Sequence, residues 1–364
     1  MMLRIKMAFV TELFYPSIGG QEFRFMQLAS GLAKRGAEVD VYTSDHLGSL
    51  SRKEEMDKIH IVRFVTLRNY VKPSSRAFIP LVKYVSAVSK LVKKLVEGNY
   101  DHILINQMPI LHLFSIPSND NIIIDWCETY EKGLLRLVLS HGTRRFKRGI
   151  AVSEDIADTI RFFNPLMSVE VIRTPVEVDK YLCDENKKDD DLILFVGRLV
   201  LHKNILSLVD AISYVNSSSS RRRKLIIVGD GPLKQILVRK EKEYDYIRVL
   251  GRVSEEEKIE LFKRASLLAI PSLREGFPNV VAEAIASLTP ILTARAPLNN
   301  VYRFVERYKI GFVAPSPSSK DLANTIMKID ADAWHLAVTN EMKLREEFRE
   351  ETIINRLLRF LEGA

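Results

Sequence analysis

Residues 272–285 read Ser-Leu-Arg-Glu-Gly-Phe-Pro-Asn-Val-Val-Ala-Glu-Ala-Ile, and the rest of the chain is organised around this stretch. An apolar run at 266–270 predicts a strand that leads into it. The pattern becomes helical from Pro278 or Asn279. Proline is tolerated there, because the N–H that it lacks would be unpaired in a first helical turn anyway. The stretch therefore predicts a strand, a turn and a helix in succession.

This order places two carboxylates around a helix start. Glu275 and Gly276 lie on the predicted turn, and Glu283 lies about one turn inside the helix. Unpaired N–H groups at a helix start attract anions, and a nearby carboxylate can accept hydrogen bonds from sugar hydroxyls. Phosphate beside sugar describes a nucleotide-sugar, although a capped surface helix would explain the same residues.

Length and composition indicate a soluble protein of two domains. A chain of 364 residues exceeds the usual size of a single hydrophobic core. Its 46% hydrophobic and 27% charged residues are typical of globular proteins, and no run reaches the ~18 apolar residues of a membrane span. Cys127 and Cys183 are the two cysteines and lack metal-site spacing, so we expect no disulfide framework, no metal site and a cytoplasmic location.

The net charge of +8 is concentrated in the first half of the chain. Residues 1–173 carry 24 Lys/Arg and 18 Asp/Glu, whereas the remainder carries 30 and 28. This basic half predicts an anionic partner, such as a pyrophosphate-linked acceptor or the inner face of a membrane, contacted peripherally. A lysine-rich solvated surface is the alternative.

The first half predicts a doubly wound α/β domain with a mainly parallel sheet. Strand-like runs alternate with helical patterns, and the runs lie at 5–10, 39–43, 59–66, 102–106, 121–125, 150–152 and 169–172. Gly19 and Gly20 follow the first strand, at the edge where ligands bind in open α/β sheets. They allow a ligand to approach the backbone closely, and a simple turn explains them equally well.

Polar residues after a later strand are candidates for holding an acceptor. Asp125 and Glu128 lie at the end of a run of isoleucines, and either carboxylate could act as a base toward an acceptor hydroxyl or cap a helix. Basic residues on the amphipathic helix 81–96 and in the cluster 144–148 could contact lipid headgroups. A solvated surface is the simpler interpretation of both.

The second half predicts a nucleotide-binding domain that begins at the polar connection 176–191. A buried strand at 192–196 ends in Gly197 and Arg198, and Lys203 opens the next helix. Glycine allows a tight turn, while Arg and Lys supply a planar multi-donor cation and a mobile point charge. Together they could hold a diphosphate.

Two further stretches argue against other ligands. The sequence Gly229-Asp230-Gly231 is followed by Lys234 where a dinucleotide fingerprint needs a third glycine, so NAD binding is poorly supported. Residues 221–224 read as a surface loop or hairpin, and nucleic acid is not expected as a partner.

Several motifs together resemble the retaining GT-B glycosyltransferases of family 4, the glycosyltransferase group 1 type. They span nearly the whole chain and are Tyr15-Pro16-Ser17-Ile18-Gly19-Gly20, Ala151-Val152-Ser153-Glu154, Phe195-Val196-Gly197-Arg198 with Lys203, Val228-Gly229-Asp230-Gly231-Pro232, and residues 271–284. The most specific is the pair Glu275 and Glu283, eight positions apart. The resemblance implies a GT-B fold, in which two Rossmann-like doubly wound parallel-sheet domains face each other across a cleft.

The resemblance also implies a division of roles between the domains. An N-terminal acceptor-side domain would cover residues 1–175 and be joined by a C-terminal helix at 350–364. A nucleotide-sugar-binding domain would cover residues 176–349. The donor would be a nucleotide-diphosphate sugar, transferred with retention and without a metal or other cofactor to a glycan, lipid-linked or other hydroxyl acceptor.

Each site residue receives a role from the same resemblance. Arg198 and Lys203 would neutralise the diphosphate, Glu283 would bind the ribose, and Glu275 would contact the transferred sugar. The implied donor-binding set is Gly19, Gly20, Gly197, Gly276, Phe277, Pro278, Asn279 and Glu283.

The chain departs from the family pattern at two places. It has Thr174-Pro175 where many relatives have Asn-Gly, and Cys127 where some have a histidine implicated in sugar or acceptor contact. Glu128 or Asp125 could compensate for that histidine, or the leaving phosphate could take the acceptor proton.

Two other functions remain open on the sequence. A noncatalytic GT-B subunit that binds a sugar nucleotide or glycan and scaffolds a partner enzyme would explain Cys127. A sugar-nucleotide epimerase on the same architecture would need no acceptor. The base, sugar, linkage, acceptor and oligomeric state are not specified by motif spacing.

Overall fold

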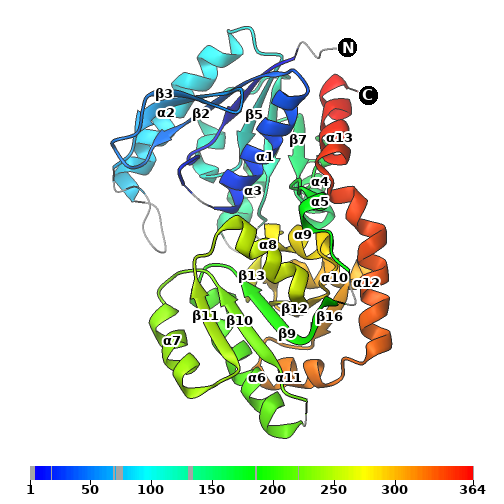
Figure 1. Cartoon of the computed structure of the whole chain (residues 1–364). Coiled ribbons are helices and arrows are strands. Elements are labelled where there is room, and N and C mark those ends of the chain that lie inside the picture. Colours follow the sequence, from blue (N-terminus) through cyan, green and yellow to red (C-terminus); the bar gives the residue numbers. More distant parts are fainter. Residues whose placement is uncertain are drawn as a thin grey trace. The chain divides into compact units, whose positions relative to one another are not determined.

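The computed structural model describes residues 5–17, 19–68, 70, 77–129, 134–184, 187–219 and 221–363. The chain divides into two compact units, each visible in Figure 1. The first unit consists of residues 1–175 together with 350–364, and the second consists of residues 176–349.

The first unit is built on a sheet whose strand order is β3-β4-β2-β1-β5-β6-β7-β8 in the part of the chain that the structure describes. Its strands are β1 (Lys6–Val10), β2 (Glu38–Asp45), β3 (Lys53–Met56), β4 (Ile59–Thr66), β5 (His102–Asn106), β6 (Ile122–Trp126), β7 (Arg148–Ala151) and β8 (Ser168–Val171). Its helices are α1 (Gly20–Lys34), α2 (Phe78–Val96), the short 3-10 helix η1 (Ile110–Phe114), α3 (Leu134–Thr143), α4 (Glu154–Phe163) and α13 (Glu350–Glu362).

The sheet is parallel except at one edge. Neighbouring strands from β4 to β8 pair in parallel, which requires a crossover between each pair, and helices supply most of these crossovers. The central strands β1 and β6 are buried over almost their whole length, as expected for a sheet covered on both faces. The sequence-based prediction of a doubly wound α/β fold is confirmed for this unit.

Sequence analysis did not predict strand β3. Its residues, Lys-Glu-Glu-Met, are charged and few, so they carry no apolar signal. The strand pairs antiparallel with β4 at the edge of the sheet, where charged residues discourage pairing with another chain.

Helix α13 packs against α1, although the two are separated by more than 300 residues in sequence. Figure 1 shows them side by side in the first unit, α1 in blue and α13 in red. A Cβ placed on Gly31 of α1 would lie 2.6 Å from Ile354 of α13. Glycine therefore allows the two helices to approach closely, and Ile354 belongs to the same apolar core as Phe25 and Leu28.

The second unit has a parallel sheet with the order β11-β10-β9-β12-β14-β16 and a separate pair, β13-β15, among the described residues. Its strands are β9 (Asp189–Val196), β10 (Lys224–Val228), β11 (Ile247–Gly251), β12 (Ala265–Ile270), β13 (Arg274–Glu275), β14 (Ile291–Ala294), β15 (Leu298–Asn299) and β16 (Gly311–Ala314). Its helices are α5 (Val178–Tyr181), η3 (Leu201–Lys203), α6 (Ile205–Ser218), α7 (Lys234–Glu243), α8 (Glu255–Arg264), α9 (Asn279–Ala286), α10 (Val301–Tyr308), α11 (Ser319–Met327), α12 (Ala331–Arg345) and η4 (Glu346–Phe348).

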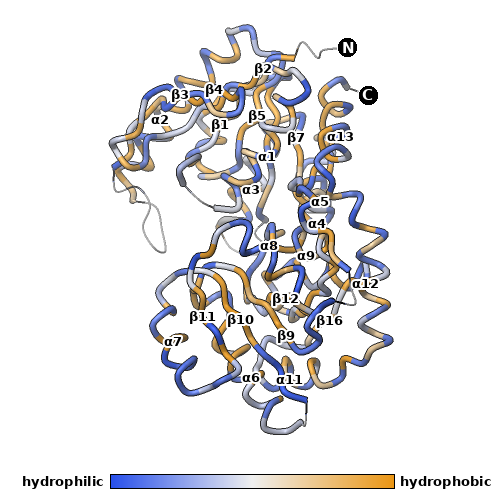
Figure 2. Tube along the Cα trace, in the orientation of Figure 1, coloured by the Kyte–Doolittle hydropathy of each residue, from blue (hydrophilic) through white to orange (hydrophobic). Residues whose placement is uncertain are grey.

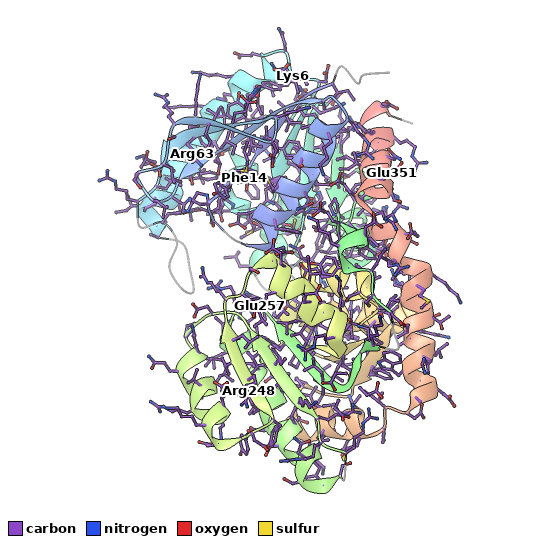
Figure 3. The ribbon with its side chains drawn as sticks, viewed as in Figure 1. Lys6, Phe14, Arg63, Arg248, Glu257 and Glu351 are labelled. Carbon is purple, nitrogen blue, oxygen red and sulfur yellow. The ribbon has the colours of Figure 1, made fainter. Side chains whose placement is uncertain are left out.

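Hydropathy follows these elements. In Figure 2 the central strands of the second unit are mainly orange and α7 is mainly blue, as expected for a covered sheet with an exposed helix. Helix α8 begins at a hydrogen-bonded cap, since the Ser254 hydroxyl accepts from the backbone N–H of Glu257, which Figure 3 labels.

The interpretation of residues 221–224 as a surface loop was only partly correct. Lys224 already belongs to β10, and the side chain of Arg223 is 95% buried. Its Nη1 donates to the carbonyl oxygen of Asp190 at 2.6 Å, so this arginine holds the start of β9.

Candidate active site

In the second unit, a lysine and a glutamate that lie 72 residues apart in sequence form an ion pair. Lys203 ends η3, Glu275 lies in β13, and Lys203 Nζ donates to Glu275 Oε1. Ser272 Oγ donates to the same oxygen at 2.9 Å. The backbone joins the two loops, because the N–H of Leu273 donates to the carbonyl oxygen of His202 at 2.7 Å. One cation and one carboxylate thus share a site at the carboxyl ends of β9 and β12.

Two glycines hold the loops after β9 and β10 together. Gly229 and Gly231 have φ values of +137° and +157°, which side-chain-bearing residues rarely adopt. A Cβ on Gly229 would lie 1.9 Å from the carbonyl oxygen of Gly197, and one on Gly231 would lie 2.5 Å from that of Leu199. Their absent side chains let the two loops touch, which explains this motif without a dinucleotide.

Gly197 differs from these two glycines. A Cβ placed on it would lie 3.7 Å from the Phe195 ring and 4.0 Å from Lys203 Cε, which are ordinary contacts. The fold of the unit would therefore accept a side chain at position 197. The missing side chain leaves space beside Lys203.

Positive charge is concentrated around this space. Burial lowers the pKa of His202, the charges of Lys203, Arg274 and Arg198 lower it further, and the charge of Glu275 opposes them. Three cations thus outnumber the one carboxylate that acts on this histidine. The site therefore suits an anion, and the exposed side chain of Arg198 extends the positive surface outward.

Helix α9 begins at Asn279, three residues after Gly276. Its N-cap residue Pro278 provides no side-chain hydrogen bond, and its first turn contains no acidic residue. The ring of Phe277 is anchored in an aromatic cluster, 4.8 Å from Phe304 in an edge-on geometry and stacked 6.3 Å from Phe348. Phe277 thus fixes the helix start, whose positive dipole end suits an anion.

Glu283, in the second turn of α9, is buried and paired. Lys258 Nζ donates to its Oε1 at 2.7 Å and also lies 2.9 Å from Glu255. Burial raises the pKa of Glu283, whereas Lys258 and the hydroxyl of Tyr181 oppose this rise. Its other oxygen, Oε2, is buried without a hydrogen-bond partner among the described residues. This oxygen is an acceptor that a ligand hydroxyl could satisfy.

In the first unit, Asp125 forms a buried ion pair with Arg24 of α1. The guanidinium donates to both carboxylate oxygens, at 2.7 to 3.0 Å, and both side chains are at least 98% buried. Cys127 Sγ donates to Asp125 Oδ2 at 3.2 Å, and burial raises the pKa of this thiol well above its usual value. An aspartate held in this way is poorly placed to take a proton from an acceptor.

Gln107 fixes the loop that carries Glu128, and sequence analysis missed it. Its Oε1 accepts from the backbone N–H groups of Cys127 and Glu128 at 2.8 and 2.9 Å, and its Nε2 donates to the Glu128 carbonyl oxygen at 2.7 Å. The Glu128 side chain remains half-exposed. A lone buried glutamine that acts 20 residues away leaves no local signal in the sequence.

Gly19 and Gly20 mark the start of α1. Gly19 is the N-cap residue in extended conformation, and a Cβ on it would lie 2.4 Å from the carboxylate of Glu22. Ser17 Oγ donates to that carboxylate at 3.0 Å. This glycine makes room for Glu22 to fold back over the helix start.

The predicted residues are therefore divided between the two units. Gly197, Lys203, Glu275 and the start of α9 lie in the second unit, whereas Gly19, Asp125 and Glu128 lie in the first. In the described residues, no three His, Cys, Asp or Glu side chains are grouped so as to hold a metal ion. No described helix is long and apolar enough to cross a membrane.

Two family models match the chain in succession. The model "Glycosyltransferase Family 4" matches residues 18–180, and the model "Glycosyl transferases group 1" matches residues 182–353. A curated α-1,4-N-acetyl-D-galactosaminyltransferase of Campylobacter jejuni, named for an undecaprenol-diphosphate-linked acceptor, is 30% identical over 131 residues, which are 35% of this chain and 36% of that protein. The first curated relatives are matched over only 24% and 36% of their lengths.

Solved structures are similar over nearly the full chain. Sucrose-phosphate synthase from Thermosynechococcus elongatus has a TM-score of 0.77 at 19% identity and covers 99% of both chains. Anabaena HepE in complex with UDP-glucose has a TM-score of 0.71 at 18% identity, covering 99% of this chain and 100% of that chain. At such low identity the likeness shows the fold, which is the GT-B arrangement of two Rossmann-like parallel-sheet domains.

Proposed function

The chain belongs to the family 4, group 1 glycosyltransferases, and we propose that it moves a sugar from a nucleotide-diphosphate sugar to a hydroxyl acceptor with retention and without a metal. The observation that carries the proposal is the Lys203–Glu275 pair at the space beside Gly197. A phosphate-binding cation and a hydroxyl-binding carboxylate meet there, which is the chemistry of a donor that joins phosphate to sugar.

Departure of the nucleoside diphosphate develops negative charge on the phosphate. Lys203, Arg198 and the start of α9 are proposed to stabilise that charge, as a metal ion does elsewhere. Each charge-assisted contact contributes about 1.5–3 kcal/mol. Preorganised cations of this kind stabilise the leaving group more than the intact donor, because the charge increases as the bond breaks.

The nucleoside is assigned to Glu283. Its unpartnered Oε2 would accept a hydrogen bond from a ribose hydroxyl, while Lys258 opposes the rise in the pKa of the carboxyl and fixes its position. The domain roles follow: residues 176–349 bind the donor, and residues 1–175 with 350–364 serve the acceptor. Gly19 and Gly20 remain candidates for approaching the donor phosphates.

On the acceptor side we favour Glu128 over Asp125. Asp125 is fully buried and bonded to Arg24 and Cys127, whereas Glu128 is partly exposed on a loop fixed by Gln107. Glu128 would orient the acceptor hydroxyl, and the leaving phosphate would take its proton. The acceptor is a glycan, a lipid-linked sugar or another hydroxyl compound. We also propose a cytoplasmic location, with the N-terminal unit in peripheral contact with the inner face of a membrane.

A noncatalytic scaffold is a second candidate, and Cys127 favours it. The thiol stays protonated and bonded to Asp125, so it cannot replace an acid–base histidine. Such a protein would bind donor and never turn it over.

The test is donor hydrolysis and transfer with a panel of nucleotide-sugars, beginning with UDP-glucose. Wild type should release UDP, and Glu275→Gln should lower the rate about 100-fold without weakening UDP binding, because Lys203 is then no longer paired with Glu275. Full activity in both Glu275→Gln and Lys203→Ala would overturn the site assignment. Donor binding without turnover by wild type, across acceptor extracts, would favour the scaffold.

A further inference from the structure

One face of the first unit combines exposed apolar side chains with an excess of positive charge. It is formed by α2, η1 and α3, and η1 contacts both helices. Ser89 Oγ of α2 donates to the carbonyl oxygen of Ser115 at 2.6 Å, and a Cβ on Gly142 of α3 would lie 3.7 Å from the Phe114 ring. These elements therefore form one continuous layer, which we term the α2–α3 face.

Helix α2 shows how this face departs from an ordinary amphipathic packing. Its inward stripe of Tyr84, Val88, Val92 and Leu95 is buried. Phe78 and Ile79 in its first turn are nevertheless 76% and 80% exposed. Packing on the sheet accounts for the inward stripe and leaves these two side chains in solvent.

The same exposure continues on the neighbouring elements. Leu134 and Leu137 of α3 are 75% and 57% exposed, and Leu111 and Phe114 of η1 are also exposed. Single exposed apolar residues are common on protein surfaces, but a group on three adjacent elements marks an interaction surface.

The charges on this face have one sign. Helices α2 and α3 and the segment 144–147 that follows α3 contain no Asp or Glu, and their eight Lys and Arg side chains are all exposed: Lys83, Lys90, Lys93, Lys94, Arg136, Arg144, Arg145 and Lys147. The nearby Asp120 pairs with Lys147 at 2.8 Å and neutralises one of them. A surface that only contacts water usually carries charges of both signs, and these segments carry only positive ones.

We infer that the α2–α3 face docks on an anionic lipid bilayer, with its apolar side chains entering the headgroup region and its basic side chains contacting lipid phosphates. Apolar insertion combined with Lys and Arg is the composition that selects anionic membranes. This inference rests on the proposed membrane contact of the N-terminal unit and does not depend on the proposed reaction.

The experiment is co-sedimentation of the full chain with vesicles of phosphatidylglycerol or phosphatidylcholine, without donor. We expect binding to the anionic vesicles only. Lys93→Glu with Lys94→Glu should weaken it at least tenfold, since each basic residue near a bilayer contributes about fivefold. The matched control, Arg239→Glu with Lys242→Glu on α7, makes the same change in net charge and should bind as wild type does.

A second pair of variants tests insertion. Phe78→Ser with Ile79→Ser should also weaken vesicle binding, whereas the control Leu336→Ser on α12 should not. UDP release from the donor should persist in all of these variants. Binding to neither vesicle, or equal losses in the α2 and α7 charge variants, would overturn the proposal. So would unchanged binding of the serine variant, which would indicate purely electrostatic adsorption without insertion of apolar side chains.

Discussion

Lys203 and Glu275 neutralise each other in the second unit, with side chains only 19% and 10% exposed. The cation proposed for the donor phosphate is therefore held by the carboxylate proposed for the donor sugar. A phosphate that binds Lys203 competes with Glu275. On the proposed assignment, Lys203 would turn to the phosphate and Glu275 would then accept hydrogen bonds from sugar hydroxyls, so the two halves of the donor would be recognised together.

Replacing Lys203 by methionine keeps its length and removes its charge. We expect Lys203→Met to weaken binding of the donor's nucleoside diphosphate roughly 10- to 150-fold, the equivalent of a lost charge-assisted contact of about 1.5–3 kcal/mol. Isothermal titration calorimetry measures the change. Lys240→Met on α7, where the lysine pairs with Glu243, is the matched control and should leave the affinity unaltered. Equal losses in both variants would contradict the role of Lys203.

Lys258→Met should destabilise the second unit, because it leaves Glu283 buried without its cation. Removing one partner of a buried ion pair costs about 3–5 kcal/mol. Since burial already raises the pKa of Glu283, the loss should be largest at neutral pH and shrink in acid, where the carboxyl becomes protonated. Urea unfolding at pH 5 and pH 8 measures this difference.

The control for that experiment is Lys263→Met on the same helix. Lys263 pairs with Glu260 at the surface, an interaction that contributes at most about 1 kcal/mol. Comparable destabilisation by both variants would show that the buried Lys258–Glu283 pair contributes no more to stability than a surface pair does.

Glu341 of α12 provides a second pH-dependent prediction. It is fully buried, both of its oxygens lack hydrogen-bond partners among the described residues, and burial raises its pKa well above the usual value. A raised pKa contributes stability below the unfolded-state pKa, and this contribution is lost as the pH rises through the folded-state value. Glu341→Gln should therefore raise the melting temperature at pH 8 more than at pH 5. A lower melting temperature of Glu341→Gln at pH 8 would contradict this prediction.

Substitution of Asp125 should mainly lower stability, whereas substitution of Glu128 should mainly lower activity. Asp125→Asn leaves the buried Arg24 without its counter-ion, so we expect a loss of about 3–5 kcal/mol in stability and a kcat that is largely retained by folded protein. Glu128→Gln should lower kcat/KM for the acceptor with an unchanged melting temperature. Thermal scans and initial rates distinguish the two variants, and the reverse pattern would identify Asp125 as the acceptor-side residue.

Local features made most of the fold predictable from sequence. Strand, turn and helix around Glu275 follow from an apolar run, a glycine and a proline, and α9 begins at Asn279 as expected. The alternation of apolar runs likewise predicted both parallel sheets. Where the local signal was absent, as in the charged edge strand β3, the prediction missed the element.

The polar partners of the site could not be predicted in the same way. Arg24 reaches Asp125 across 101 residues, and Lys258 reaches Glu283 across 25. The sequence around an arginine or lysine does not identify a distant partner, because such pairing depends on which strand ends and helix faces the fold brings together. Sequence analysis consequently offered Asp125 as one of two candidate bases without revealing that Arg24 pairs with it.

The packing of α13 against α1 determines how this protein can be divided experimentally. Because residues 350–364 complete the core of the first unit, a fragment ending at residue 175 would leave Phe25 and Leu28 uncovered and should aggregate. A usable N-terminal fragment needs the last helix supplied as a separate peptide or fused through a linker. The interior segment 176–349, in contrast, can be excised as one continuous piece.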